Sequence, residues 1–292
     1  MKIGFSLSNN QGIEDVQAII RLATRAEELG FASVWASDHV FNVSYVYERI
    51  GDRPYYDPLT LLSYIAAVTT RIGLGTSVLV LPYHHPMRLA KAAATLDVLC
   101  GGRLMLGVGV GVIAEELNAM GSPYEERGAR TDEAIAIMQA LWTQARPSHQ
   151  GKTYQFSGMA FAPKPLQKPH IPILIGGVSR AAMRRAARLG NGWHPTAMAP
   201  ETLRESMHYL AEQAQAAGRS AADIPVSISI PLQGGRPGRY ALGLEPAEMI
   251  EKIQAFAELG VETVVVSPYT GEARDMTQAL EVIAHEVIPA CV

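Results

Sequence analysis

Short β-branched and apolar runs alternate along the chain with longer stretches whose apolar residues recur at helical spacing, and Gly and Pro separate the two kinds of segment. The predicted strands are Ile3–Leu7, Ser33–Ala36, Ile72–Leu81, Leu104–Val108, Ile173–Ile175, Gly192–His194, Val226–Ile230 and Thr263–Ser267. The predicted helices are Glu14–Leu29, Leu59–Val68, Met87–Leu99, Glu133–Thr143, Arg180–Leu189, Glu201–Ala217, Pro246–Leu259 and Arg274–Val287. Strict alternation of this kind is typical of a parallel sheet with helices outside it.

The number of repeats favours a closed α/β barrel, a (β/α)8 TIM barrel, over an open doubly wound sheet. Such a barrel takes roughly 250 residues, so we expect one domain over residues 1–292. Long connections at 41–58, 145–172 and 231–245 predict loop insertions, the first and third at the C-terminal face of the barrel. Glycines at 30, 190 and 260 each follow a predicted helix, where a positive φ is common.

Charge and cysteine content exclude several classes of protein. The chain has 25 basic and 28 acidic side chains, which argues against a nucleic-acid surface. Two cysteines without a Cys-x-x-Cys or His–Cys cluster predict no metal site, and free thiols suit a cytoplasmic protein. The first residues show no signal-peptide pattern, and the most apolar segment, Ile72–Leu81, is too short to cross a bilayer. We therefore expect no membrane partner.

The segment from Glu27 to His39 is the most informative for chemistry. A helix ends at Gly30, an apolar strand follows, and the strand ends in Asp38 and His39. Because active sites of repeating strand–helix proteins lie at the carboxyl ends of the strands, His39 is placed where a substrate would bind.

Two further segments extend the pattern. The first runs from Arg71 through the Ser77-Val78 pair and Pro86 to Gly109, and the second runs from Pro172 through Gly176-Gly177 to Trp193. Together with Trp35 and Asp38-His39, the ordered set resembles the bacterial luciferase-like monooxygenase superfamily, and within it most closely the branch that uses the deazaflavin coenzyme F420. The resemblance extends from residue 1 to about residue 290.

The resemblance implies a TIM barrel whose carboxyl-end cavity holds F420 or, alternatively, FMN. It also implies a non-prolyl cis peptide at Ser77-Val78, hydride transfer with a small organic substrate, a homodimer, and a flavin or F420 reductase as a possible partner. The cofactor-binding residues expected from it are Asp38, Thr76, Ser77, Val78, Gly109, Gly176, Gly177 and Ser179. The phosphate is expected at Gly176–Ser179, since backbone amides at a helix start bind phosphate.

His39 is the predicted catalytic residue, as acid, base or electrostatic partner. Some deazaflavin-dependent sugar dehydrogenases carry a glutamate where this chain has Val112, which makes a sugar-phosphate dehydrogenase a poor match. Glu115 and Glu116 follow, and either could enter the cavity or face water. The second acid–base group is therefore not identified, and Asp38 could bind the ring edge, orient His39 or cap a turn.

A substrate pocket is predicted from Tyr45, Tyr56, His84 and His194, although a surface turn explains His84 and ordinary loop packing explains the tyrosines equally well. Three functions compete. An F420-dependent oxidoreductase is the leading one, an FMN-dependent two-component monooxygenase is the alternative within the family, and a non-catalytic flavin-binding relative is the alternative of another class. A metal-dependent hydrolase lacks the expected carboxylate and His-x-His ligands.

Overall fold

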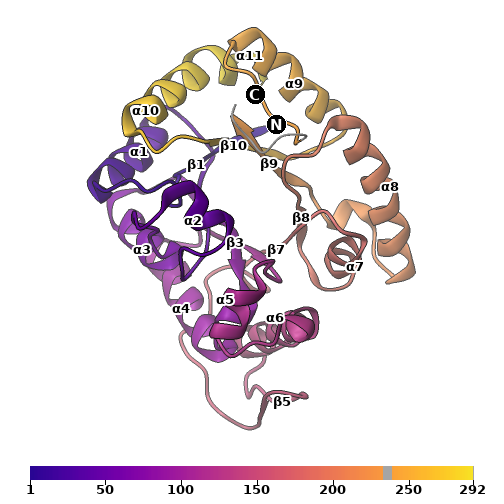
Figure 1. The fold of residues 1–292 in the computed structure, drawn as a ribbon. Helices are drawn as coiled ribbons and strands as arrows, with labels where there is room; N and C mark the ends of the chain where they lie inside the picture. Colours follow the sequence, from indigo (N-terminus) through magenta and orange to yellow (C-terminus); the bar gives the residue numbers. More distant parts are fainter. Residues whose placement is uncertain (233–238, 292) are drawn as a thin grey trace.

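The structure is a computed structural model that describes residues 1–232 and 239–291. Within these residues, eight parallel strands form a barrel with helices around it (Figure 1). The strands are β1 (Lys2–Ser6), β2 (Ser33–Ala36), β3 (Gly73–Val80), β4 (Leu104–Gly109), β7 (Ile173–Gly176), β8 (Gly192–His194), β9 (Ser227–Leu232) and β10 (Thr263–Pro268).

The strands pair in the order β8-β7-β4-β3-β2-β1-β10-β9. Two parallel bridges, between Trp193 and Val226 and between Thr196 and Ser229, join β8 to β9 and close the ring. The predicted (β/α)8 TIM barrel is therefore confirmed. Each predicted strand is present within two residues at either end, because each is a short apolar run bounded by turn residues.

Helices connect the strands around the outside of the barrel. They are α1 (Val16–Glu28), α2 (Tyr45–Ile50), α3 (Pro58–Val68), α4 (Pro86–Leu99), α5 (Ala114–Ala119), α6 (Arg127–Thr143), α7 (Arg180–Leu189), α8 (Pro200–Ala216), α9 (Pro246–Glu258), α10 (Ala273–Val282) and α11 (Ile288–Cys291). Polar side chains cap several of them: Asp15, Asp57 and Ser179 accept hydrogen bonds from backbone N–H groups in the first turns of α1, α3 and α7. A π-helical turn (Ile283–Val287) follows α10 in the segment predicted as one helix.

One expectation about helix ends is wrong. Gly30 and Gly260 have the positive φ expected after a helix, at +86° and +82°. Gly190 instead has φ −87°. A side chain there would approach Cγ1 of Ile175 to 2.8 Å. Glycine at this position therefore allows α7 to pack close to β7, and it is not needed for a left-handed turn.

Three long connections leave the regular pattern. The first contains α2, which the sequence did not predict, and α5 in the connection after β4 was also missed. The second connection forms a hairpin of β5 (His149–Gln150) and β6 (Gln155–Phe156), which projects from the body of the barrel (Figure 1). In the third connection, residues 233–238 lie outside the described residues.

Candidate active site at the carboxyl end of the barrel

His39 lies just beyond the carboxyl end of β2. Asn9 holds this end of the strand in place, since its side-chain amide donates to the Ser37 carbonyl (2.8 Å) and accepts from the Ser37 N–H (2.9 Å). The His39 ring contacts a carboxylate on one side and a phenol on the other: Nδ1 lies 2.6 Å from Oε2 of Glu116, and Nε2 lies 3.1 Å from the hydroxyl of Tyr45. Its side chain is 12% exposed, so one edge can reach a bound molecule.

Glu116 is the carboxylate that organises this site. It is fully buried, and it accepts hydrogen bonds from the His39 ring, the Tyr83 hydroxyl (2.6 Å) and the backbone N–H groups of Val40 (2.6 Å) and Phe41 (3.1 Å). Burial raises the pKa of the Glu116 carboxyl, but the hydrogen bonds from His39 and Tyr83 outweigh that effect and the net pKa is lowered. Glu116 is therefore an ionised group that positions His39 and the chain after β2.

Three tyrosines surround the His39 ring. The ring centroids of Tyr45, Tyr55 and Tyr83 lie 5.8, 5.5 and 6.5 Å from that of His39. Tyr56, predicted to line the substrate pocket, instead donates its hydroxyl to the Glu14 carbonyl (2.9 Å). The adjacent Tyr55 contacts the His39 ring instead, because neighbouring residues in an extended segment point in opposite directions.

Asp38 does not orient His39, which corrects one of its expected roles. Its buried carboxylate accepts hydrogen bonds from the Val80 N–H (3.0 Å) and from Nε2 of His84 (2.8 Å), so it ties the end of β2 to the segment after β3. Burial lowers the pKa of His84, but the hydrogen bond and charge of Asp38 outweigh it and the net pKa is raised. The structure thus brings His84 together with Asp38 rather than with His39.

His194 lies inside the barrel, which contradicts its expected place in the substrate pocket. Only 2% of the residue is exposed, and its ring stacks on Trp35 at 4.9 Å. Nδ1 contacts the Ser227 hydroxyl (2.7 Å) and Nε2 contacts the Ser77 hydroxyl (2.9 Å). Burial lowers the pKa of His194 to about 4, so the ring is neutral at pH 7. Its contact with the Ser77 hydroxyl holds that side chain in place.

The burial of the His194 ring predicts that the fold is less stable at acidic pH. The folded-state pKa of about 4 lies below the ordinary value of 6.5, so the unfolded chain takes up the proton first as the pH falls. Stability is lost between pH 6.5 and pH 4, and lowering the pH from 7.5 to 5 should cost about 2 kcal/mol through this ring alone. Urea unfolding of wild type and His194→Gln at both pH values measures the difference, and His208→Gln, which removes an exposed imidazole, is the control. Equal pH dependence in all three proteins would contradict the prediction.

The predicted non-prolyl cis peptide is present at Ser77-Val78, and the pairing of β3 with β4 shifts register between Thr76 and Leu79. The Val78 side chain lies against two glycines: a Cβ added to Gly109 or Gly176 would come within 2.8 Å of its methyl groups. These glycines therefore make room for the Val78 side chain.

Thr76 also departs from expectation. It is fully buried, and its hydroxyl donates to the Gly107 carbonyl (2.8 Å). The hydroxyl expected to line a cofactor therefore joins β3 to β4 instead.

The segment expected to hold a phosphate is open to solvent. Gly177 has φ +108°, and Trp193 donates its indole N–H to the Gly177 carbonyl (2.9 Å). Ser179 caps α7 by accepting from the Ala182 N–H (3.2 Å). The first turn of α7 contains no acidic residue and begins with Arg180, so the helix start is an electropositive group of N–H donors.

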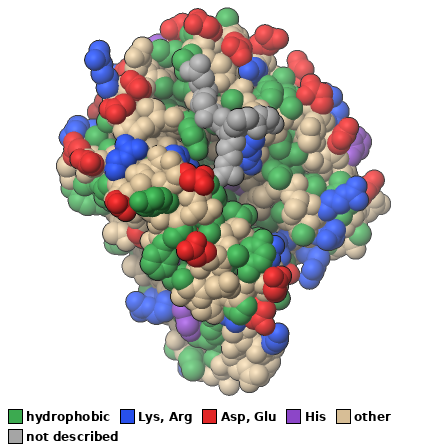
Figure 2. Space-filling view, viewed as in Figure 1, with side chains coloured by type: hydrophobic (Ala, Val, Ile, Leu, Met, Phe, Trp, Pro, Cys, Tyr) green, Lys and Arg blue, Asp and Glu red, His purple; other side chains and the backbone are tan. Residues whose placement is uncertain are grey.

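Exposed apolar side chains gather on the loops at this end of the barrel. Val40 and Phe41 follow β2, Val112 follows β4 and Val178 follows β7, and each is more than two-fifths exposed. Figure 2 shows hydrophobic side chains over α2 and α5 on this face. An apolar rim beside an electropositive helix start fits a planar flavin or deazaflavin with a phosphate.

Sequence reasoning missed Tyr83, and it left Glu116 undecided beside Glu115. Helical spacing in this segment could have favoured Glu116, since Glu116 and Leu117 follow the apolar Ile113 by three and four residues and so lie on its face, whereas Glu115 does not. Among the described residues, no group of three or more His, Cys, Asp or Glu side chains could hold a metal ion. No helix in the described part is long and apolar enough to span a membrane.

Known families and proteins are similar to this chain in sequence. A family model described as luciferase-like monooxygenase matches residues 1–237. The Mycobacterium tuberculosis protein Rv0940c is 36% identical over 194 residues, which cover 63% of this chain and 66% of the relative. An F420-dependent glucose-6-phosphate dehydrogenase of Amycolatopsis mediterranei is 31% identical over 249 residues, covering 83% of this chain and 72% of the relative.

Solved structures share the fold. An F420-dependent secondary alcohol dehydrogenase in complex with an F420–acetone adduct superposes with a TM-score of 0.85 at 20% identity, covering 100% of this chain and 99% of the other. The oxygenating constituent of 3,6-diketocamphane monooxygenase from Pseudomonas putida, in complex with FMN, gives a TM-score of 0.80 at 20% identity with the same coverage. The match over residues 1–237 shows that the chain belongs to the luciferase-like monooxygenase family of oxidoreductases, as its motifs predicted.

Proposed function

We propose that this protein is an F420-dependent oxidoreductase that moves a hydride between the deazaflavin and a small organic substrate. The observation that supports it most is the His39–Glu116 pair at the mouth of the barrel, with Nδ1 2.6 Å from the carboxylate. The named relative at 31% identity is an F420-dependent dehydrogenase. When bound, the deazaflavin would supply the carbon that gives or accepts the hydride.

The chain's own residues would bind and orient the reactants and move a proton. Because Glu116 is ionised, Nδ1 of His39 carries the hydrogen that it donates to that carboxylate. Nε2, beside the Tyr45 hydroxyl, is then the atom that takes up or releases a proton. The start of α7 would hold the cofactor phosphate, and Val78 would support the ring.

Titration of the purified protein with F420 and with FMN, followed by fluorescence, tests the cofactor. We expect F420 to bind at least tenfold more tightly than FMN. Tight binding of FMN alone would instead support the two-component monooxygenase, and binding of neither would refute both functions.

A matched pair of variants tests the phosphate position. Ser179→Asp keeps a good helix cap but places a negative charge at the start of α7. We expect it to weaken F420 binding at least tenfold through charge repulsion. Ser220→Asp makes the same change at another capped turn, that of Ala221–Asp223, and should leave binding unchanged. If Ser179→Asp and wild type bind F420 with equal affinity, the cofactor phosphate does not bind at the start of α7.

The same proposal includes a cytoplasmic homodimer, supplied with reduced cofactor by a separate reductase. The homodimer is supported by an apolar surface on the neighbouring helices α3 and α4, where Tyr64, Val68, Val98 and Leu99 are between 39% and 69% exposed. Leu99→Glu should convert the dimer to monomers in sedimentation velocity, because a charge would be buried without a partner. The exposed Val112→Glu, on the loop after β4, is the control, and an unchanged dimer in Leu99→Glu would place the interface elsewhere.

A further inference from the structure

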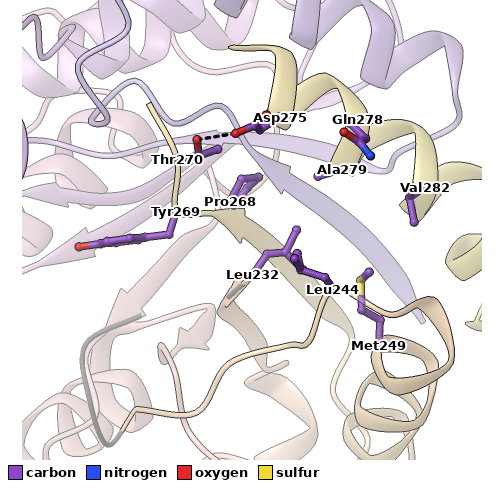
Figure 3. Close-up of a pocket in the computed structure, with 10 residues that line it drawn as sticks. All are labelled: Leu232, Leu244, Met249, Pro268, Tyr269, Thr270, Asp275, Gln278, Ala279 and Val282. Atoms are coloured by element: carbon purple, nitrogen blue, oxygen red, sulfur yellow. Dashed lines mark hydrogen bonds between the residues drawn. The ribbon is translucent and has the colours of Figure 1, made fainter. Parts of the chain in front are cut away.

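Cavities lie at both ends of the barrel. The one between α9 and α10 is at the carboxyl end, since its lining residues Leu232 and Pro268 end β9 and β10 (Figure 3). It shares that end with His39. A second cavity, of about 580 Å³, lies at the amino end. The first residues of five strands line this amino-end cavity: Lys2, Ser33, Gly73, Ser227 and Thr263.

A layer of large side chains closes the inner end of the amino-end cavity. Trp35 packs with Leu174, Met105 and a valine of β10 in one cluster, and its ring stacks on His194 at 4.9 Å. Trp35, Leu174 and Met105 line the cavity from this layer. The cavity therefore ends inside the barrel, and the Trp35–His194 stack separates it from the carboxyl end.

Small residues leave this space open. The interior of a TIM barrel is usually filled by bulky branched side chains. Here a Cβ added to Gly73 would approach Cε of Met105 to 3.0 Å, and one added to Gly4 would approach Oγ of Ser33 to 2.7 Å, so both glycines face the interior. A space of this size lies within the range of about 300–1,000 Å³ that is typical of ligand sites.

The inner end of the cavity combines apolar groups with hydroxyl groups. Leu174 is 8% exposed and Met105 is partly exposed, so a molecule that enters can bury apolar surface against both. The Met105 thioether is flexible and contacts aromatic rings favourably. Ser33 and Ser227 add hydroxyls that are 2% and 8% exposed. This end of the cavity suits a ring with one polar substituent.

Ser227 offers the hydrogen bond for such a substituent. Its hydroxyl lies 2.7 Å from Nδ1 of His194, and Nε2 of the same ring lies 2.9 Å from the Ser77 hydroxyl. A neutral imidazole has one donor and one acceptor nitrogen, so Ser227 either donates to the ring or accepts from it. In both cases Ser227 keeps a hydrogen-bonding position for a ligand. A ligand hydroxyl fits either arrangement, because it can both donate and accept.

The charged side chains described at this cavity belong to its outer rim. Lys2 pairs with Glu262 at 2.6 Å, and both are exposed. Arg71 is exposed to solvent, and Arg103 donates to four backbone carbonyls and to the Thr69 hydroxyl. A charged ligand at the inner end would lose its hydration against the two apolar side chains there. An uncharged ligand avoids that cost.

We propose that the amino-end cavity is a second ligand site, which binds a small uncharged aromatic molecule carrying a hydroxyl group. The ring packs on Met105 and Leu174, and the hydroxyl bonds to Ser227. Because the Trp35–His194 stack separates this site from His39, the bound molecule is not the substrate of the proposed reaction. The proposal goes beyond the proposed function and does not depend on it.

Methyl NMR of the full chain, with carbon-13 in the methionine methyl groups, tests the site with p-cresol as the probe. We expect the Met105 signal to shift and to saturate, because the aromatic ring lies against that methyl group. The signal of Met249, which lines the cavity in Figure 3, should stay in place. Met105→Leu and Met249→Leu assign the two signals. A shift of the Met249 signal alone, or an unmoved Met105 signal, would overturn the proposal.

Two charged analogues test the ligand class in the same titration. 4-Methylbenzoate and 4-methylbenzylamine keep the methyl-substituted ring of p-cresol but carry a negative or a positive charge. We expect both to bind at least tenfold more weakly than p-cresol, because their charge loses hydration at the inner end. If 4-methylbenzoate or 4-methylbenzylamine shifts the Met105 signal with the affinity of p-cresol, the uncharged class is wrong.

Variants of the lining test the position. Thr263→Phe fills the cavity with a residue that strands favour, and should weaken p-cresol binding at least tenfold. Thr143→Phe adds the same bulk at the exposed end of α6 and should change nothing. Ser227→Ala removes the hydroxyl and should weaken binding severalfold. Unchanged affinity in folded Thr263→Phe would place the ligand elsewhere. If Thr263→Phe does not fold, unchanged affinity in Ser227→Ala overturns the proposal instead.

Discussion

Replacing His39 with alanine should lower kcat by about 10²- to 10⁴-fold, the range for loss of a positioned acid–base group. In our proposal, Nε2 of this ring is the atom that takes up or releases the proton. The cofactor would be held mainly by backbone and apolar contacts elsewhere, so the Kd for F420 should stay within about threefold of wild type. Steady-state kinetics with one accepted substrate, together with F420 titration, measures both quantities.

His85 supplies the control for this variant. His85 is exposed and contacts Tyr154 rather than the site, so His85→Ala should keep wild-type kcat. Added imidazole should restore part of the activity of His39→Ala, which a purely structural role would not allow. Unchanged turnover in His39→Ala would remove this residue from the mechanism.

Replacing Glu116 with alanine should lower the free energy of unfolding by about 3–5 kcal/mol, the cost of removing one member of a buried charged group. Four donors would lose their acceptor at once: the His39 ring, the Tyr83 hydroxyl and the N–H groups of Val40 and Phe41. Buried donors without acceptors each cost stability. Urea unfolding at pH 7.5 measures the change.

Glu115 is a matched control because it is adjacent in α5 and exposed. Glu115→Ala should stay within about 0.5 kcal/mol of wild type. Glu116→Gln keeps the shape but removes the charge that keeps the hydrogen on Nδ1 of His39. It should therefore shift the pH profile of kcat, a readout that simple loss of packing would not move. A stability loss for Glu116→Ala no larger than that for Glu115→Ala would show that the carboxylate is not needed.

The barrel could be predicted from the sequence because its signals are local. Runs such as Thr263–Ser267 are apolar and β-branched, and stretches such as Arg180–Leu189 carry apolar residues at helical spacing, so each element is specified by its own residues. The helices α2 and α5 were missed because each has only six residues and lies in a long connection without a clear periodic pattern. Their positions depend on contacts with distant parts of the chain.

The site was predicted in part, and the errors share one cause. His39 follows directly from its place after a strand, since the carboxyl end of β2 determines its location. The choice between Glu115 and Glu116, and between Tyr55 and Tyr56, depends on which way a side chain points at the end of a loop. The inward position of His194 depends on Trp35 and on the serines at 77 and 227, which come from three other strands.

The sequence by itself determined the alternation of strands and helices, the barrel that follows from it, and the placement of an Asp-His pair and a Gly-Gly turn at strand ends. Periodicity and turn chemistry act over a few residues, so they can be read from one segment at a time. Only the tertiary structure decided that Glu116 pairs with His39, that Asp38 pairs with His84, and that a cavity opens between α9 and α10. Burial and hydrogen bonding between residues far apart in the chain select these partners, because a buried polar group must find whichever partner the packed fold brings within reach.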